Sequence, residues 1–187
     1  MNNERKWILR GGRVLNPAPF CLIGIVNVTP DSFSDGGKYI DPRNAVAHGL
    51  RLLDEGAGML DLGAESTRPF AEPVPEGEEI ARLMPVVARL REQRPDAVLS
   101  VDTLKAGTAR AALEGGADII NDVSACVADP ALLDVLAEYK PGYVLMHSQG
   151  SPREMQVNPR YGNVVEEILA FFEEHLARLV KAGLPED

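Results

Sequence analysis

The chain has 187 residues, of which 45% are hydrophobic and 25% are charged. These proportions are typical of one globular domain with an apolar core. The formal net charge of −9 argues against nucleic acid and an anionic membrane surface as partners, because its field repels phosphate groups. The sequence shows neither a signal-peptide pattern nor an apolar run of the roughly 20 residues that cross a membrane. We therefore expect a single cytoplasmic domain over residues 1–187.

The two cysteines carry no recognisable site pattern. Cys21 and Cys126 are far apart and lack the spacing of a metal site or a redox pair. We expect both thiols to be reduced and neither to take part in the functional site.

Five short apolar runs, rich in Val, Ile and Leu and bounded by turn residues, indicate buried strands. They span residues 21–28, 59–66, 97–103, 118–124 and 143–148. Ahead of the first run, residues 6–16 alternate around a Gly-Gly pair. This pattern predicts a small β-hairpin that closes one end of the fold.

Segments with helical spacing separate the strands. Asp41 and Asp129 each precede a proline, which places an N-cap carboxylate before a proline at the first helical position. Helices are also predicted over residues 76–94 and 105–115, the latter ended by two glycines. The clearest helix covers residues 163–183, where the apolar residues form one stripe.

This strict alternation of strand and helix requires a parallel sheet with right-handed crossovers. Two architectures satisfy it: an open, doubly wound five-stranded sheet, or part of a (β/α)8 TIM barrel. In a barrel all strand C-termini surround one pocket, whereas in an open sheet only the strands beside the switch point do so. Every predicted strand ends in a polar residue, and these residues are Asn27, Asp61 with Glu65, Asp102, Asn121 with Asp122, and His147. The barrel is therefore favoured, with only about its first five β/α units in this chain.

The loop after the first strand, NVTPDSFSDGG over residues 27–37, is too long and too polar for an ordinary connection. We interpret it as a functional flap. The alternative is a loop that only caps the next helix through Asp31 or Ser32.

Two segments, GIVNVTPDSFSDGG (24–37) and DLGAESTRP (61–69), closely resemble the signature segments of dihydropteroate synthases. SVDT (100–103), GADIINDVSA (116–125) and LMHSQGSPREMQ (145–156) match that family in the same order and at suitable spacing. The resemblance implies a TIM-barrel transferase of folate biosynthesis. Its members join a dihydropterin pyrophosphate to p-aminobenzoate, and sulfonamides target them.

The resemblance also implies roles for residues at the strand ends. Asn27 would hold Mg²⁺ and the pyrophosphate, and an amide oxygen is a suitable ligand for this ion. Asp102 and Asn121 would hold the pterin ring, with Asp102 also able to stabilise positive charge that develops on it. Asp61 belongs to the same substrate-binding face, and Met146 forms part of an apolar pterin floor.

Residues of the first two loops resemble the remaining contacts. Arg68 is the local cation for the pyrophosphate, since a guanidinium group matches phosphate oxygens bidentately. Thr67, Pro69 and Phe33 resemble the p-aminobenzoate contacts, and Asp35 resembles the acid that organises the closed site. His147 fits either a site residue or a structural one.

No Ser-His-Asp or Cys-His arrangement supplies a nucleophile, which agrees with the family's chemistry, in which the pyrophosphate departs largely before the amine attacks. One alternative is a methyltetrahydrofolate-corrinoid methyltransferase, which shares the barrel and the pterin site but lacks the two signature loops. Another is a non-catalytic, truncated pterin-binding module. The segments that the family carries on its sixth to eighth strands do not occur in residues 1–187. We therefore expect this chain alone to be inactive, and expect either self-association or a longer native chain.

Overall fold

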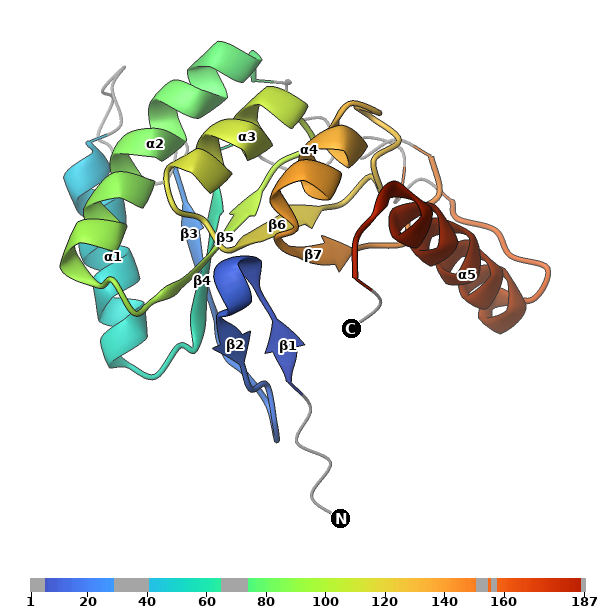
Figure 1. The fold of residues 1–187 in the computed structure, drawn as a ribbon, viewed down its shortest axis with the longest axis horizontal. Helices are drawn as coiled ribbons and strands as arrows, with labels where there is room; N and C mark the ends of the chain where they lie inside the picture. Colours follow the sequence, from blue (N-terminus) through green and yellow to red (C-terminus); the bar gives the residue numbers. More distant parts are fainter. Residues whose placement is uncertain (1–5, 29–40, 65–73, 151–154, 156–157, 186–187) are drawn as a thin grey trace.

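From residue 23 onward, strands and helices alternate along the chain (Figure 1). The computed structural model describes residues 6–28, 41–64, 74–150, 155 and 158–185. Its parallel strands are β3 (Ile23–Asn27), β4 (Met59–Gly63), β5 (Val98–Asp102), β6 (Ile119–Asp122) and β7 (Gly142–Leu145). Its helices are α1 (Pro42–Asp54), α2 (Glu76–Gln93), α3 (Ala106–Glu114), α4 (Leu132–Tyr139) and α5 (Val164–Ala182). Four of these strands lie within the predicted runs, and β7 begins one residue before its run, at Gly142.

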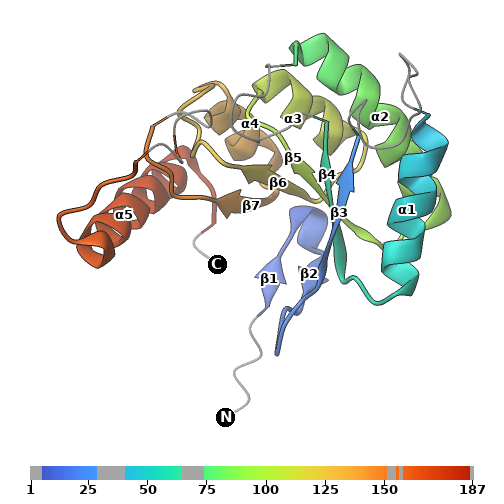
Figure 2. The same ribbon diagram turned by 180° about the vertical axis from the view of Figure 1, so that it is seen from behind.

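The order of the strands distinguishes between the two predicted architectures. It is β3-β4-β5-β6-β7, so each strand pairs in parallel with the next one along the chain and the order never reverses. Helices α1 to α4 all cover the same side of the sheet (Figures 1 and 2). A doubly wound sheet would reverse its order and carry helices on both sides. The sheet is therefore the curved wall of a (β/α) barrel, as predicted.

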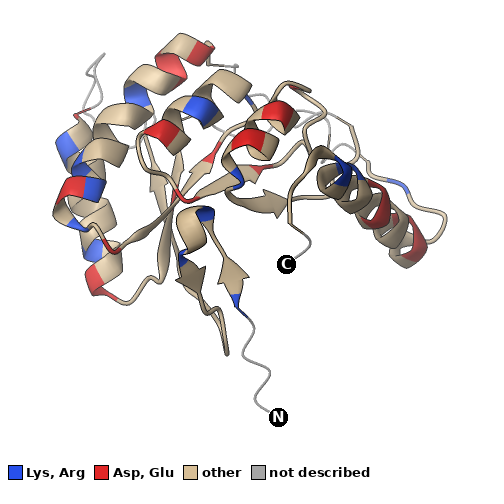
Figure 3. Cartoon of the chain, in the orientation of Figure 1, with Lys and Arg blue, Asp and Glu red and all other residues tan. Residues whose placement is uncertain are grey.

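The outer face of this wall forms the larger apolar core. Alternate strand residues point toward the helices, as the two-residue period of a strand requires. They are the fully buried Val26, Leu60, Leu62, Leu99, Val101 and Ile120, and they pack against apolar residues of α1 to α4. The polar sides of the helices face outward, where Figure 3 shows basic and acidic residues interspersed. In the described ranges, none of the helices is both long enough and apolar enough to span a bilayer.

Near the N-terminal ends of β4 to β6 the inner face is apolar, and a hairpin covers it there. Strand β1 (Trp7–Ile8) pairs antiparallel with β2 (Val14–Leu15). Leu9, between them, is 2% exposed and packs with residues that begin three strands, Met59, Val98 and Ile119. Gly142 admits this close approach, because a Cβ there would lie 2.7 Å from a Leu9 methyl group.

A buried ion cluster fastens the hairpin to the sheet. Asp118, immediately before β6, accepts hydrogen bonds from the Leu99 amide at 3.0 Å, from Arg91 at 2.9 Å and from Arg13 of the hairpin at 3.3 Å. The two guanidinium groups also donate to backbone carbonyls of the turn before β5, at Pro95 and Ala97. Every charge in the cluster therefore has partners.

The two predicted N-caps have different outcomes. Asp41 caps α1, with its carboxylate accepting from the Arg43 amide at 2.9 Å and Pro42 as the first helical residue. The prediction for Asp129 was wrong, because α4 begins at Leu132 with Ala131 as its N-cap. One oxygen of Asp129 accepts from the Ala131 amide, and the other reaches the Ala106 amide at the start of α3. The contact with Ala106 joins residues that are far apart in the sequence, so the residues around Asp129 do not predict it.

Candidate active site

Polar side chains gather at the C-terminal edge of the inner face. The pairing register places Asn27, Gly63, Asp102 and Asn121 in one row across β3 to β6. Side chains of one row point to the same side of a parallel sheet, and in a barrel that side is the interior. Gly63 contributes no side chain, which leaves space between Asn27 and Asp102. The structure thus brings together three of the residues that sequence analysis placed in the site.

Asp61 lies one step lower on the same face and contacts the row above it. The Asn121 Nδ2 amine donates to Asp61 Oδ2 at 3.0 Å. The second oxygen, Asp61 Oδ1, is buried without a hydrogen-bond partner among the described residues. The neighbouring Ser100 hydroxyl, in register with Asp61, is likewise buried and unpartnered there. Native proteins rarely leave buried polar atoms unpaired, so these two atoms mark a place where a ligand or water binds.

The loop that follows Asp102 is held by hydrogen bonds to its neighbours. The Thr103 amide donates to the Asn121 carbonyl at 3.0 Å, so the β5 pairing with β6 continues past Asp102. Two carboxylates accept from amides in the first turn of α3, Asp129 from Ala106 and Glu76 from Gly107, both at 2.8 Å. Negative charge is favourable at a helix N-terminus. These contacts fix the backbone on the C-terminal side of Asp102.

A buried ion pair adds to this support. Glu79 of α2 is fully buried, and its Oε2 lies 2.6 Å from the Lys105 ammonium group in the same loop. Sequence reasoning missed it, although a signal exists. Glu79 occupies the helical stripe that continues with Leu83, Val86 and Leu90, all of which are buried. A glutamate on the apolar face of a helix indicates a buried partner.

Asp122 points to the opposite face of the sheet and does not join the site. Its carboxylate is fully buried and accepts from the Ser124 amide, the Cys126 amide and the Tyr143 hydroxyl at 2.6–2.9 Å. These bonds hold a turn in which Ala125 and Cys126 adopt left-handed backbone angles, with φ of 55° and 56°. Burial raises the pKa of the Cys126 thiol to about 11. Burial and the adjacent Asp122 carboxylate raise the pKa of Tyr143 far above its ordinary value.

The residues after β7 are less clearly part of the site. Met146 is half-buried immediately beyond the strand. His147 packs edge-on against Phe171 of α5, with ring centroids 4.7 Å apart, and lies 5.9 Å from the Tyr161 ring. These contacts favour the structural interpretation of His147. Both cysteines are free, and Cys126 is buried.

Several predicted site residues lie outside the described residues. They are Phe33 and Asp35 of the first loop and Glu65, Thr67, Arg68 and Pro69 of the second. Both loops leave the C-terminal ends of strands, β3 and β4 respectively.

The described part of the chain offers few side chains that could bind a metal ion. Within the described part of the chain, no cluster of three or more His, Cys, Asp or Glu side chains is arranged to hold a metal ion. Asn27 is exposed at the end of β3 and offers one amide oxygen. Mg²⁺ commonly binds one or two protein ligands and completes its shell with water and substrate phosphates. Asn27 therefore fits an ion that arrives with a phosphate ligand, but not a site made by protein alone.

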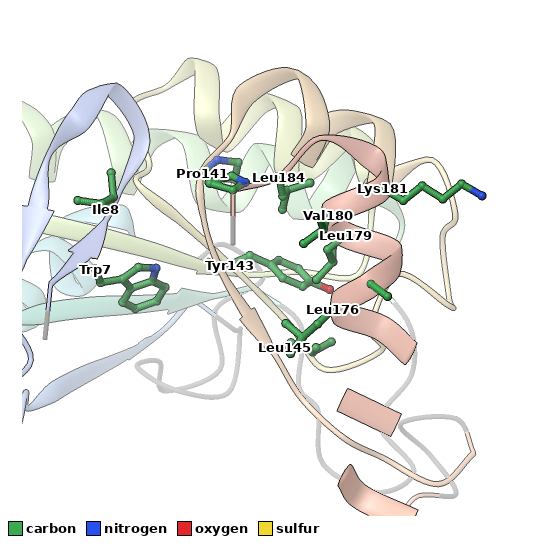
Figure 4. Close-up of a pocket in the computed structure, with 12 residues that line it drawn as sticks. Trp7, Ile8, Pro141, Tyr143, Leu145, Leu176, Leu179, Val180, Lys181 and Leu184 are labelled. Atoms are coloured by element: carbon green, nitrogen blue, oxygen red, sulfur yellow. The ribbon is translucent and has the colours of Figure 1, made fainter. Parts of the chain in front are cut away.

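An apolar groove of about 690 Å³ lies elsewhere, between the hairpin, β7 and α5 (Figure 4). Its lining includes Trp7, Tyr143, Leu176 and Val180, and none of the polar strand-end residues contributes to it. It follows β7, which is an edge of the five-stranded sheet in the described part of the chain. Its lining is mostly apolar, and the polar groups that a substrate needs for orientation gather at the strand ends instead, so this groove is a poor candidate for an active site.

A parallel barrel wall with amide and carboxylate groups at its C-terminal edge defines a (β/α)-barrel protein with a ligand site at that edge. A family model described as "Pterin binding enzyme" matches residues 23–187. The chain belongs to this family. Dihydropteroate synthase of Mycobacterium leprae is 45% identical over 168 residues, which is 89% of this chain and 58% of that protein.

Solved structures show the same relationship. The Yersinia pestis dihydropteroate synthase in a sulfonamide drug complex superposes with a TM-score of 0.88 at 41% identity, over 97% of this chain and 65% of that one. The Xanthomonas albilineans dihydropteroate synthase with 4-aminobenzoic acid gives a TM-score of 0.85 at 45% identity, over 96% and 63%. The chain therefore spans about three-fifths of the length of the relatives it matches.

Proposed function

We propose that this chain carries the pterin-binding part of a dihydropteroate synthase, which condenses 6-hydroxymethyl-7,8-dihydropterin pyrophosphate with p-aminobenzoate. The observation that carries the proposal is the 45% identity to the Mycobacterium leprae synthase over 89% of the chain. The row of Asn27, Asp102 and Asn121 on one barrel edge supports it, since a polar heterocycle needs convergent hydrogen-bonding groups.

Asp102 and Asn121 would hold the pterin ring, and Asp61 would complete the same face. The two side chains project from neighbouring strands in register, which suits the adjacent donors and acceptors on one edge of a planar ring. The Asp102 carboxylate would also stabilise positive charge on the ring as the leaving group departs. Met146 would contribute an apolar surface beneath the ring.

Asn27 and Arg68 would hold the pyrophosphate. Asn27 would bind Mg²⁺ through its side-chain oxygen, and the bound ion would neutralise charge on the leaving group. Arg68 would donate bidentately to phosphate oxygens. β4 ends at Gly63, the register partner of Asn27, and Arg68 follows five residues later in the sequence, which supports this assignment.

The two loops would hold the second substrate. The Xanthomonas albilineans relative is described with 4-aminobenzoic acid, and the Yersinia pestis relative with a sulfonamide drug. We propose that Thr67, Pro69 and Phe33 contact p-aminobenzoate here, that Asp35 organises the closed site, and that sulfonamides compete for this position. Loops over the strand ends of a barrel are suited to such closure.

The reaction requires no protein nucleophile. The bond from the pterin methylene carbon to the pyrophosphate oxygen breaks, and pyrophosphate leaves with the electron pair. The amine nitrogen of p-aminobenzoate then bonds to that carbon and loses one proton. The protein contributes by positioning both substrates and stabilising charge on the leaving group.

Ordered binding tests this proposal. A p-aminobenzoate analogue should bind only in the presence of pyrophosphate and pterin, because the second site forms over the first. Binding of pterin without any such response would favour a methyltetrahydrofolate-corrinoid methyltransferase or a non-catalytic pterin-binding module. Binding of neither ligand would contradict the proposal.

We further propose that residues 1–187 by themselves form no product and self-associate. In the described part of the sheet, β3 and β7 are edge strands, and Ile23 and Ile25 on the inner face are 54% and 62% exposed. Unpaired edges and exposed apolar side chains favour association. Product formation by a monomer, measured with Mg²⁺ and confirmed by sedimentation, would contradict both statements.

A further inference from the structure

The loop between Asp102 and helix α3 is held from two sides. On one side, the Thr103 amide donates to the Asn121 carbonyl at 3.0 Å, so β6 holds the residue next to Asp102. On the other side, the Lys105 ammonium group lies 2.6 Å from Glu79 Oε2, so helix α2 holds the end of the loop. The Lys105 amide donates to the Thr103 hydroxyl at 3.2 Å and joins the two attachments. The backbone that carries Asp102 is therefore tied both to β6 and to α2.

The Glu79–Lys105 ion pair is unfavourable for the stability of the fold in two respects. Glu79 is fully buried, and its second oxygen, Oε1, has no hydrogen-bond partner in the described ranges. Lys105 occupies the N-cap of α3 without a side-chain capping bond, and a cation is unfavourable at a helix N-terminus. Desolvation of a buried ion pair can exceed the attraction between its charges, so an apolar pair of similar volume is often at least as stable. Stability alone therefore does not account for these two residues.

An ion pair differs from an apolar contact in that it fixes a geometry. A charge-assisted hydrogen bond requires a short distance and a narrow range of angles, whereas apolar side chains can repack. Asp102 is the register partner of Asn121, and a small displacement of a hydrogen-bonding group weakens its bond to a ligand steeply. We propose that Glu79 and Lys105 are positioning residues, whose ion pair keeps Asp102 in place beside Asn121 to bind a pterin. The inference rests on the proposed function only in taking a pterin as the ligand of Asp102.

Replacement of both residues by methionine separates positioning from stability. Glu79→Met together with Lys105→Met removes both charges and leaves two unbranched apolar side chains of similar length. The midpoint of urea unfolding should stay the same or rise, because the desolvation penalty disappears together with the attraction. The matched control is Glu138→Met with Arg110→Met, which removes an exposed ion pair of 2.9 Å between α3 and α4.

The position of the loop can be measured without a ligand, by hydrogen exchange on the ¹⁵N-labelled 187-residue chain. The Thr103 amide reports on the loop, and the Leu99 amide, which donates to Asp118, is the reference in the same strand. The ratio of the Thr103 rate to the Leu99 rate should rise at least about tenfold in the methionine variant at positions 79 and 105, and stay constant in the control. Glu79→Gln, which keeps the shape of the side chain, should raise the ratio about threefold, and it replaces the double variant if the latter does not fold.

The effect on the ligand is measured by titration of the same samples with pterin. The unmodified chain and the control at positions 110 and 138 should bind pterin equally tightly. The variant at positions 79 and 105 should bind it at least about tenfold more weakly, because Asp102 is no longer held beside Asn121. An unfolding midpoint that has not fallen shows that this loss of affinity does not come from general instability.

The outcomes separate the positioning role from the proposed function. An unchanged exchange ratio in the folded variant would overturn the proposal. So would an unchanged affinity for pterin, or a loss of affinity that the control shares. If pterin does not bind the unmodified chain, the proposed function fails, and the exchange ratio alone decides whether the ion pair holds the loop of Asp102.

Discussion

Each end of the sheet carries an aspartate, Asp118 at the N-terminal end and Asp61 at the C-terminal end, and the two carboxylates differ in how many hydrogen-bond partners they have. At the N-terminal end, Asp118 has a backbone amide and two arginines as partners. At the C-terminal end, Asp61 has one amide partner and a buried oxygen without any in the described ranges. A buried polar group is costly unless it is paired. The fully paired end therefore stabilises the fold, and the incompletely paired end retains binding capacity.

The difference extends to the apolar residues around each aspartate. The N-terminal half of the inner face is filled by Leu9, Met59, Val98 and Ile119. The C-terminal row carries Asn27, Asp102 and Asn121 and is partly open, with Asn27 exposed. This division is expected of a barrel, where one end carries stability and the other carries function. The following predictions test it by perturbing each end.

The largest effect on stability should come from Asp118→Ala. The substitution leaves Arg13, Arg91 and the Leu99 amide without their shared acceptor, so the free energy of unfolding should fall by about 3–5 kcal/mol. Urea titration monitored by circular dichroism measures this change. The control is Asp96→Ala, whose carboxylate is 77% exposed and 3.6 Å from Arg94, and a loss below about 1 kcal/mol is expected there. Equal losses in the two variants would show that the cluster does not stabilise this end.

A smaller loss of stability should follow from a larger residue at position 142, where Leu9 of the hairpin packs closely against Gly142. In Gly142→Ala the new methyl group would meet Leu9 at 2.7 Å and Ile119 at 2.9 Å, so overpacking should destabilise the chain by about 1–3 kcal/mol. Gly77→Ala in α2 is the matched change, because nothing lies within 4 Å of a Cβ there. It should be neutral or slightly stabilising, since alanine favours helix. Thermal melting compares the two, and a stable Gly142→Ala variant would contradict the packing described.

Raising the pH should modestly lower the free energy of unfolding, through the Cys126 thiol in the turn after β6. The folded state holds the Cys126 proton with a pKa of about 11, against about 8.5 for a free thiol. Stability from this group is therefore complete below about pH 8.5 and is lost as the pH rises toward 11. Denaturant titrations across that range should show the decline, and Cys126→Ala should flatten it. The same slope in the variant would assign the decline to other groups, among them Tyr143.

The smallest effect on stability should come from Asp61→Leu. One hydrogen bond is lost, but a buried unpartnered oxygen is removed with it, so the change should stay within about 1 kcal/mol of zero. A loss as large as that of Asp118→Ala, in the same denaturant assay, would mean that the two ends do not differ in the way described.

Much of this arrangement follows from the sequence. The apolar runs located all five strands, since a buried parallel strand needs continuous apolar residues. The polar residue at each strand end predicted the shared edge, and register then placed Asn27, Asp102 and Asn121 in one row. Gly116, predicted to stop α3, has a φ of 102°, which favours glycine.

Long-range pairing accounts for what the sequence did not predict. Asp118 finds Arg13 105 residues away, and Lys105 finds Glu79 26 residues away. Asp129 was misassigned because its carboxylate also serves the helix that begins at Ala106. Asp122 was grouped with Asn121, yet successive strand residues point to opposite faces, so it belongs to the outer layer. None of these partners can be identified before the fold brings them together.

The central claim is that the C-terminal edge of the inner face binds a pterin. Mapping of chemical-shift changes on the ¹⁵N-labelled chain during titration with pterin tests it most directly. We expect the largest changes at Asp61, Asp102 and Asn121, and none beyond noise at Leu9, Arg13 and Asp118. Changes confined to the groove around Trp7, Tyr143 and α5 would contradict the account.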